Sequence, residues 1–186
     1  MPTSLRWAVR GAFVTAITAL GAITAITIPG LSLVPFTFQV FGVFLAGGIL
    51  PARWAALSQL SYIALGILGA PIFAEGQRGL AVLIGPFGGY LWAYPVAAWI
   101  MASLVHKSRH SRLRLFMGLI SALAIIYLGG MVGLVIITHA SWTHAFLEGV
   151  LPFIGWDVIK AVLAWPIISQ LHHWVEKSTA KERLSA

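Results

Sequence analysis

The sequence has no cysteine and little charge of either sign. Its 186 residues include 12 Lys or Arg and 5 Asp or Glu, so charged residues make up 9% of the chain. Soluble domains carry roughly a quarter charged residues, so this chain has too few to cover a water-facing surface. The lack of cysteine excludes disulfides, a thiolate nucleophile and a Cys-based metal site. Low charge also excludes intrinsic disorder, and the low polarity excludes an ordinary soluble enzyme.

Hydrophobic residues, in contrast, make up 59% of the chain. They occur in runs of about 20 residues, the length that spans a bilayer as a helix. The runs are too long and too weakly alternating to be barrel strands. We therefore predict an all-α integral membrane protein, a single domain over residues 1–186 with six transmembrane helices. The predicted spans are residues 8–28, 34–50, 54–73, 82–104, 115–138 and 150–171.

The basic residues predict the orientation of these spans. Ten of the twelve fall before or at the start of the first span or after the second, fourth and sixth spans, whereas Arg78 lies on the opposite side and Lys160 lies within the last span. By the positive-inside rule, both termini are expected to be cytoplasmic. This distribution accounts for the formal net charge of +7. We expect contacts with lipid head groups and no binding of nucleic acid.

Two charged residues stand inside the last apolar run. Asp157 and Lys160 are three positions apart, so they share one face of a helix. A charged group at the bilayer centre costs about 2.5–3.5 kcal/mol on insertion scales, and intramembrane charges usually serve a function. The pair is therefore expected to form a polar ligand site or an ion pathway. A buried pair that only fixes helix packing is the other interpretation.

Polar residues also occur at two predicted outer span ends. Arg78 is the single basic residue of its loop, where it could bind a carboxylate in bidentate fashion or pair with Glu75. Thr37 and Gln39, at the start of the second span, supply a hydroxyl and an amide. Polar residues at span ends are common, so the second group alone favours a structural role.

Small residues recur four apart on the first span, at Ala8, Ala12 and Ala16. Such spacing allows close approach between helices in a membrane. The stripe predicts either docking of a partner's helix or packing within the chain, and the spacing alone does not separate them.

Signals for catalysis or metal binding are weak. His139 and His144 do not share a helix face, and the sequence near them supplies no complete metal-ligand set. Ser141 lies near both histidines, but the spacing fits no protease geometry. We expect neither an enzyme nor a bound cofactor. An ion-coupled permease with Asp157 and Lys160 as its relay remains the main rival to a binding protein, and a purely structural membrane subunit is another.

Five segments in this order resemble one family, BioY, the biotin-binding S components of energy-coupling factor (ECF) transporters. They are residues 34–39 (VPFTFQ), 45–53 (LAGGILPAR), 69–74 (GAPIFA), 85–90 (GPFGGY) and 151–160, which ends in Asp-Val-Ile-Lys. The resemblance runs from about residue 8 to residue 170. Three positions depart from the family pattern: Phe87 stands where Thr is expected, Gly155-Trp156 where Pro-Gly is usual, and Glu75 where Gly is usual.

The resemblance implies a six-helix S-component fold in the bacterial cytoplasmic membrane, with an outward-facing vitamin pocket. It also implies a partner module made of a transmembrane T subunit and two ATPase subunits. In that family the alanine stripe of the first span faces the T subunit. Some BioY proteins are thought to work without the module, and the sequence leaves this open.

The resemblance further implies roles for single residues. Asp157 would accept hydrogen bonds from the ureido N–H groups of biotin, and Lys160 would donate to the ureido carbonyl. Arg78 would bind the valerate carboxylate, although the reverse pose, with Lys160 on the carboxylate, stays open. Loops 29–38 and 74–81 would close over the vitamin. Neutral helpers are expected at Gln77, Gln39 and Thr37, and ring walls at Tyr90, Phe36, Phe73 and Trp156.

Overall fold

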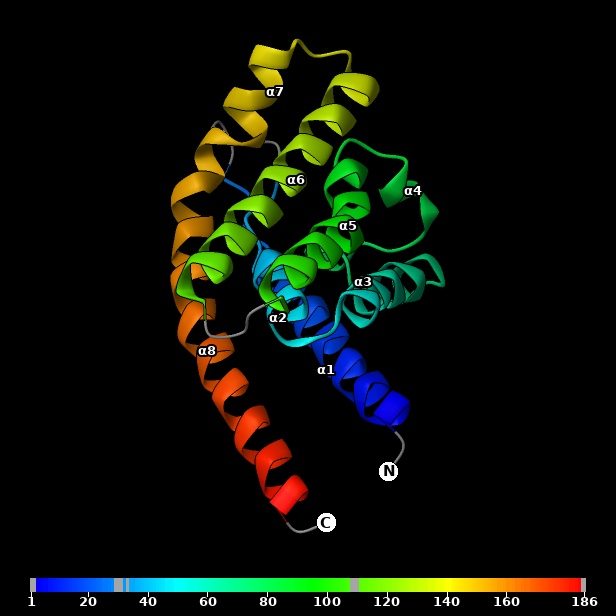
Figure 1. Cartoon of the computed structure of the whole chain (residues 1–186). Helices are drawn as coiled ribbons and strands as arrows, with labels where there is room; N and C mark the ends of the chain where they lie inside the picture. Colours follow the sequence, from blue (N-terminus) through cyan, green and yellow to red (C-terminus); the bar gives the residue numbers. More distant parts are fainter. Residues whose placement is uncertain (1–2, 29–31, 33, 108–110, 185–186) are drawn as a thin grey trace.

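The apolar runs form helices in the computed structural model, which describes residues 3–28, 32, 34–107 and 111–184, with side chains through residue 172 (Figure 1). Residues 29–31 and 33, in the first of the two loops expected to close, lie outside the described residues. Short 3₁₀ turns occupy Ala74–Gly76 and Leu151–Phe153. The α-helices are α1 (Thr3–Ile23), α2 (Gln39–Ile49), α3 (Ala52–Ile67), α4 (Leu80–Leu83), α5 (Gly88–Val105), α6 (Arg112–Thr138), α7 (Trp142–Gly149) and α8 (Ile154–Leu184).

Helix α2 lies at the centre of the packing. Nine of its eleven residues are buried, and it contacts α1, α3, α5, α6 and α8. Helices α5 and α6 pack so closely that a Cβ atom at Gly89 would overlap the backbone of Gly129. The start of α1 and the end of α8 lie at one end of the molecule, and α7 lies at the other (Figure 1). The N-terminal ends of α2, α5 and α8 therefore all face the end away from the termini.

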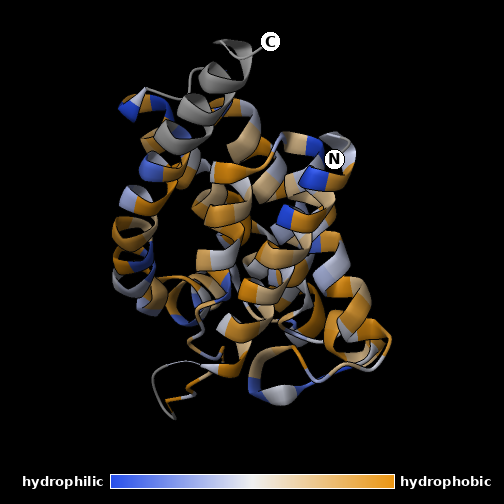
Figure 2. Ribbon diagram, turned by 90° about the horizontal axis from the view of Figure 1, so that it is seen from below, coloured by the Kyte–Doolittle hydropathy of each residue, from blue (hydrophilic) through white to orange (hydrophobic). Residues whose placement is uncertain are grey.

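The outer surface is apolar, as expected for lipid contact. Phe13 of α1, Leu113 of α6 and Val162 of α8 are each about two-thirds exposed, at 67%, 66% and 65%. Figure 2 shows hydrophobic residues over most of the helical ribbon. Three described segments are long and apolar enough to cross a membrane, namely Gly88–Val105, Arg112–Thr138 and Trp142–His172, and Gln39–Ile49 is a shorter apolar helix.

Several helices are shorter than the apolar runs that predicted them. Helix α1 ends at Ile23 rather than continuing to residue 28, because the β-branched residues that follow adopt an extended backbone. There Ile26 and Phe36 exchange both backbone hydrogen bonds as an antiparallel bridge, at 2.9 Å each. The fourth run is interrupted between α4 and α5, where Gly85-Pro86 breaks the helix. The start of the second run, which contains Pro35, is irregular through Phe38.

Local capping explains the other boundaries. Ser111 and Ser141 accept hydrogen bonds from the backbone N–H groups of Arg114 and His144, and so cap α6 and α7. His139 ends α6 in a left-handed conformation, with φ of 54°. This turn sends the chain back along α6 as the short helix α7, which the apolar pattern did not predict.

Candidate ligand site

A cavity lies among the helix ends that face away from the termini. The first turns of α2, α5 and α8, the middle of α6 and the loop after α3 all contribute to its wall. The space between these walls, open solvent at the mouth included, amounts to about 690 Å³. The lining residues are Val34, Pro35, Thr37, Gln39, Val40, Phe73, Ala74, Gln77, Val82, Phe87, Tyr90, Leu91, Tyr94, Ile126, Tyr127, Phe153, Asp157 and Lys160.

Asp157 and Lys160 form an ion pair in this wall. The Lys160 Nζ donates to Asp157 Oδ1 at 2.6 Å, and each residue is 2% exposed. Asp157 stands in the first turn of α8, where the helix dipole favours a negative charge. The Tyr127 hydroxyl of α6 donates to Asp157 Oδ2, also at 2.6 Å. Among the described residues, each carboxylate oxygen therefore has one donor and one acceptor position left.

Two aromatic rings surround the lysine ammonium. The Lys160 Nζ lies 5.9 Å from the centre of the Phe38 ring and 5.7 Å from that of the Trp156 ring. These two rings also pack edge to face, with centres 5.2 Å apart. Cation–π attraction of this kind helps to hold a desolvated cation in place. Trp156 is thus beside the charge but outside the set of residues that line the cavity.

Thr37 and Gln39 lie on the wall contributed by the start of α2. The Thr37 hydroxyl donates to Gln39 Oε1 at 2.9 Å, and Gln39 Nε2 donates to the Tyr62 hydroxyl at 2.5 Å. Both residues are buried, at 7% and 4% exposed. Tyr62 in turn donates to the backbone carbonyl of Ile72 at 2.9 Å. The wall of α2 is therefore hydrogen-bonded through α3 to the loop that follows it.

Tyr90 presents its ring rather than its hydroxyl to the cavity. The hydroxyl donates to the carbonyl of Gly149 at 2.7 Å, which ties α5 to the end of α7. The ring lies where a Cβ atom at Gly130 would be. A glycine at position 130 therefore lets α6 approach the Tyr90 ring of α5 closely. This position suits the ring wall that was predicted for Tyr90.

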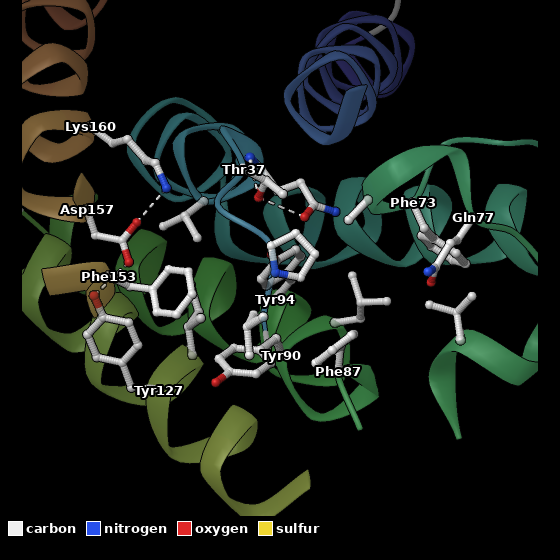
Figure 3. Close-up of a pocket in the computed structure, with 18 residues that line it drawn as sticks. Thr37, Phe73, Gln77, Phe87, Tyr90, Tyr94, Tyr127, Phe153, Asp157 and Lys160 are labelled. Carbon is white, nitrogen blue, oxygen red and sulfur yellow. Dashed lines mark hydrogen bonds and ion pairs between the residues drawn. The ribbon is translucent and has the colours of Figure 1, made fainter. Parts of the chain in front are cut away.

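The loop between α3 and α4 forms the mouth of the cavity. Phe73 is fully buried and Gln77 is exposed, and both line the cavity. Figure 3 shows these two at one end and Asp157 with Lys160 at the other. Arg78 is exposed and lies outside the lining residues.

Glu75, the departure noted in the same loop, has φ of 57° and contacts the first extended segment. It accepts a hydrogen bond from the Thr27 hydroxyl. This bond links the two loops that were expected to close over a ligand.

Seven of the ten residues predicted for the site line the cavity: Thr37, Gln39, Phe73, Gln77, Tyr90, Asp157 and Lys160. Arg78, Trp156 and Phe36 do not. Phe36 stacks on Phe153, with ring centres 4.5 Å apart, and Phe153 takes the wall position instead. The roles in ligand binding remain predictions.

Sequence reasoning missed two other aromatic residues of the wall. Tyr127 and Tyr94 both line the cavity. Their signal in the sequence is a polar phenol hydroxyl within a long apolar run. Phe87 was noted because it departs from the family pattern, and it lines the cavity.

Comparison with known proteins bears on this site. The sequence model of the BioY family matches residues 1–177. The chain belongs to the BioY family. This membership confirms the resemblance seen in the sequence, and it confirms the prediction of a transport protein rather than an enzyme.

Individual BioY relatives match over most of their length. The biotin transporter BioY of Thermotoga maritima is 36% identical over 160 residues, which cover 86% of this chain and 92% of that protein. The probable biotin transporter BioY of Pyrococcus horikoshii is 40% identical over 156 residues, covering 84% and 90%.

A solved structure matches this BioY chain as well. The crystal structure of the S component for biotin from an ECF-type ABC transporter superimposes with a TM-score of 0.84 at 26% identity. The match covers 93% of this chain and 95% of that one. The helices described above therefore adopt the S-component fold, and the chain is a membrane protein of that class.

Proposed function

We propose that this chain binds biotin in the described cavity and serves as the substrate-binding S component of an ECF-type biotin transporter. One observation carries the proposal: a nearly fully buried ion pair lines a cavity instead of a closed helix seam. A pair that only fixed packing needs no space beside it. Family membership supports biotin as the occupant.

The free hydrogen-bonding groups of the pair match a ureido ring. Among the described residues, Lys160 donates one of its three N–H groups to Asp157, so two remain for a carbonyl oxygen. The carboxylate of Asp157 keeps two acceptor positions beyond those used by Lys160 and Tyr127. Two ureido N–H groups and one ureido carbonyl fit this pattern. Hydrogen bonds to charged groups are short and strong, and low polarity around them strengthens them further.

The valerate chain then extends toward Gln77. Phe73, Phe87 and Tyr90 supply apolar walls along the way. Gln77, the residue before Arg78, already lines the mouth of the cavity. A small inward movement of the loop therefore brings Arg78 to the carboxylate. The reverse pose places the carboxylate on Lys160 and is separated from this one by ligand analogues.

The orientation follows from the fold and the charges. All six predicted spans, including the short α2, cross the bacterial cytoplasmic membrane, and both termini are cytoplasmic. The cavity then opens outward, at the end of the bundle away from the termini. Outer loops close over the vitamin, and release requires the loaded chain to reorient in the membrane.

A second groove supports docking of a T subunit. It is an open groove between α1 and α3, and Ala8, Ala12 and Ala16 are among the residues that line it. The Thr15 hydroxyl donates to the Ser58 carbonyl at 2.7 Å and holds α1 against α3 there. The alanine stripe is therefore open to a partner's helix rather than filled by the chain itself. ATPase subunits bound to the T subunit supply the energy.

Isothermal titration of the detergent-purified chain with biotin, riboflavin and thiamine tests the function. We expect saturable, stoichiometric binding of biotin alone, with no ion gradient present. Equal binding of all three vitamins, or of none, contradicts the proposal. Biotin uptake by the chain alone that collapses with the proton gradient favours the ion-coupled permease instead.

A further inference from the structure

Tyr62 lies behind the cavity wall, and its ring and its hydroxyl contact two separate parts of that wall. The residue is fully buried on α3 and does not line the cavity. Its hydroxyl bonds to Gln39 on one side and to the carbonyl of Ile72 on the other. Its ring packs edge to face against Phe73, with centres 5.5 Å apart. Tyr62 thus joins the start of α2 to the loop that forms the mouth.

The bonds of Tyr62 fix the direction of every hydrogen bond in this chain of groups. The Ile72 carbonyl can only accept, so it takes the single hydroxyl hydrogen of Tyr62. Tyr62 must then accept from the amide nitrogen of Gln39, which turns the amide oxygen toward Thr37. The Thr37 hydroxyl therefore donates to Gln39. As a result, Thr37 offers the cavity an acceptor and Gln39 offers it one remaining N–H donor.

The same hydroxyl holds the mouth loop in place. Residues 68–79 leave α3 and return to it, because the Gly79 N–H donates to the Gly66 carbonyl at 2.8 Å. The Phe73 ring fills the space that a Cβ atom at Gly66 would occupy. The Tyr62–Ile72 bond is thus the polar link between this loop and the ligand-facing groups of α2.

We propose that Tyr62 is a positioning residue that sets the donor and acceptor pattern of the cavity wall and couples that wall to the mouth loop. The inference rests on the proposed function in one respect, that biotin occupies the cavity. The link to the loop is independent of the ligand. Removal of the hydroxyl leaves the Gln39 amide free to turn and releases Ile72.

A double-mutant cycle in biotin affinity tests the first half of the proposal. Tyr62→Phe is expected to weaken binding about five- to tenfold, the usual effect of one lost hydrogen bond. Added to Gln39→Leu, it is expected to cause a smaller loss than it causes in the wild type, since the part of its effect that passes through Gln39 is already gone. Losses that simply add contradict the positioning role. Melting temperatures are measured in parallel, because a purely structural role lowers stability equally in both backgrounds.

Limited trypsin digestion without biotin tests the link to the loop. Arg78 is the cleavage site in the mouth loop, and Lys107, exposed at the opposite end, is the internal control. We expect Tyr62→Phe to raise cleavage at Arg78 several-fold relative to Lys107. Thr37→Val and Gln39→Leu, which keep the Tyr62–Ile72 bond, are expected to leave that ratio unchanged.

The outcomes separate this inference from the proposed function. An unchanged cleavage ratio in Tyr62→Phe overturns the link to the loop, even if biotin binds. A Tyr62→Phe chain that does not fold also overturns the assignment, since the hydroxyl would then support the whole bundle. Wild-type protein that binds no biotin overturns the proposed function, while the cleavage result still decides the link.

Discussion

Asp157 and Lys160 are charged residues that the fold removes almost completely from solvent, at 2% exposed each. Each charge alone costs about 2.5–3.5 kcal/mol within a membrane. Their contact at 2.6 Å offsets much of this cost but leaves donors and acceptors unused beside a cavity. A ligand with a complementary polar group satisfies those groups, so recognition and burial have the same physical basis.

Asp157→Asn is expected to abolish detectable biotin binding and to lower stability. It leaves the ammonium group of Lys160 buried without its partner, which costs about 3–5 kcal/mol. Adding Lys160→Met removes the charge and should restore the melting temperature without restoring binding. Glu148→Gln, a carboxylate outside the cavity, is the control and should bind as the wild type does. Biotin binding by the double variant would contradict the assigned role of the pair.

Tyr127→Phe is expected to weaken biotin binding about tenfold or more. Its hydroxyl donates to Asp157 Oδ2, and a hydrogen bond to a charged group contributes about 1.5–3 kcal/mol. The carboxylate would lose its second anchor and turn away from the ligand. Equilibrium titration measures the effect, and unchanged affinity would show that Lys160 alone orients the carboxylate.

At the scale of elements, the mouth loop between α3 and α4 is the part of the site that moves in the proposed binding mode. Arg78 is exposed there, whereas Gln77 lines the cavity. We expect Arg78→Gln to weaken binding of biotin but to leave the affinity for biotin amide unchanged, because the amide has no carboxylate to pair. Arg53→Gln, at the opposite end of the molecule, is the matched control. Equal weakening of both ligands would remove Arg78 from the carboxylate site.

The sequence was enough to predict the helical class and the ion pair, but not where helices stop. Runs of apolar residues predict helices because a membrane requires satisfied backbone groups. The stop at Ile23 depends on the antiparallel bridge between Ile26 and Phe36, which is a tertiary contact. Helix α7 likewise depends on the left-handed turn at His139, a conformation that is uncommon for residues other than glycine.

In the candidate site, contacts within one helix could be predicted from the sequence, but contacts between helices could not. Asp157 and Lys160 could be paired because three residues separate them on one helix. Tyr127 is 30 residues away from Asp157, and their contact depends on how α6 packs against α8. Phe36 and Phe153 show the same limit of prediction. The sequence offers both rings for the cavity wall, and the way they stack puts Phe153 at the cavity.

At the scale of the whole molecule, the proposed ligand site and the proposed docking groove lie on different faces. The cavity lies among helix ends, while the groove between α1 and α3 runs along the side. Ala12→Leu is expected to fill that groove and block co-purification with a T subunit and its ATPases, with biotin affinity unchanged. Val9→Leu, on an exposed position of α1 outside the groove, is the control. Normal assembly with Ala12→Leu would contradict docking at this groove.

The whole account depends on which end of biotin meets the buried ion pair. Titration of the wild-type chain with biotin, biotin amide and 2-iminobiotin measures this directly. In 2-iminobiotin a protonated guanidinium replaces the ureido group, so Lys160 would face a cation in place of a carbonyl. We predict that 2-iminobiotin binds at least a hundredfold more weakly than biotin, and that biotin amide loses far less. Near-equal affinity for biotin and 2-iminobiotin, with biotin amide severely weakened, would contradict the account.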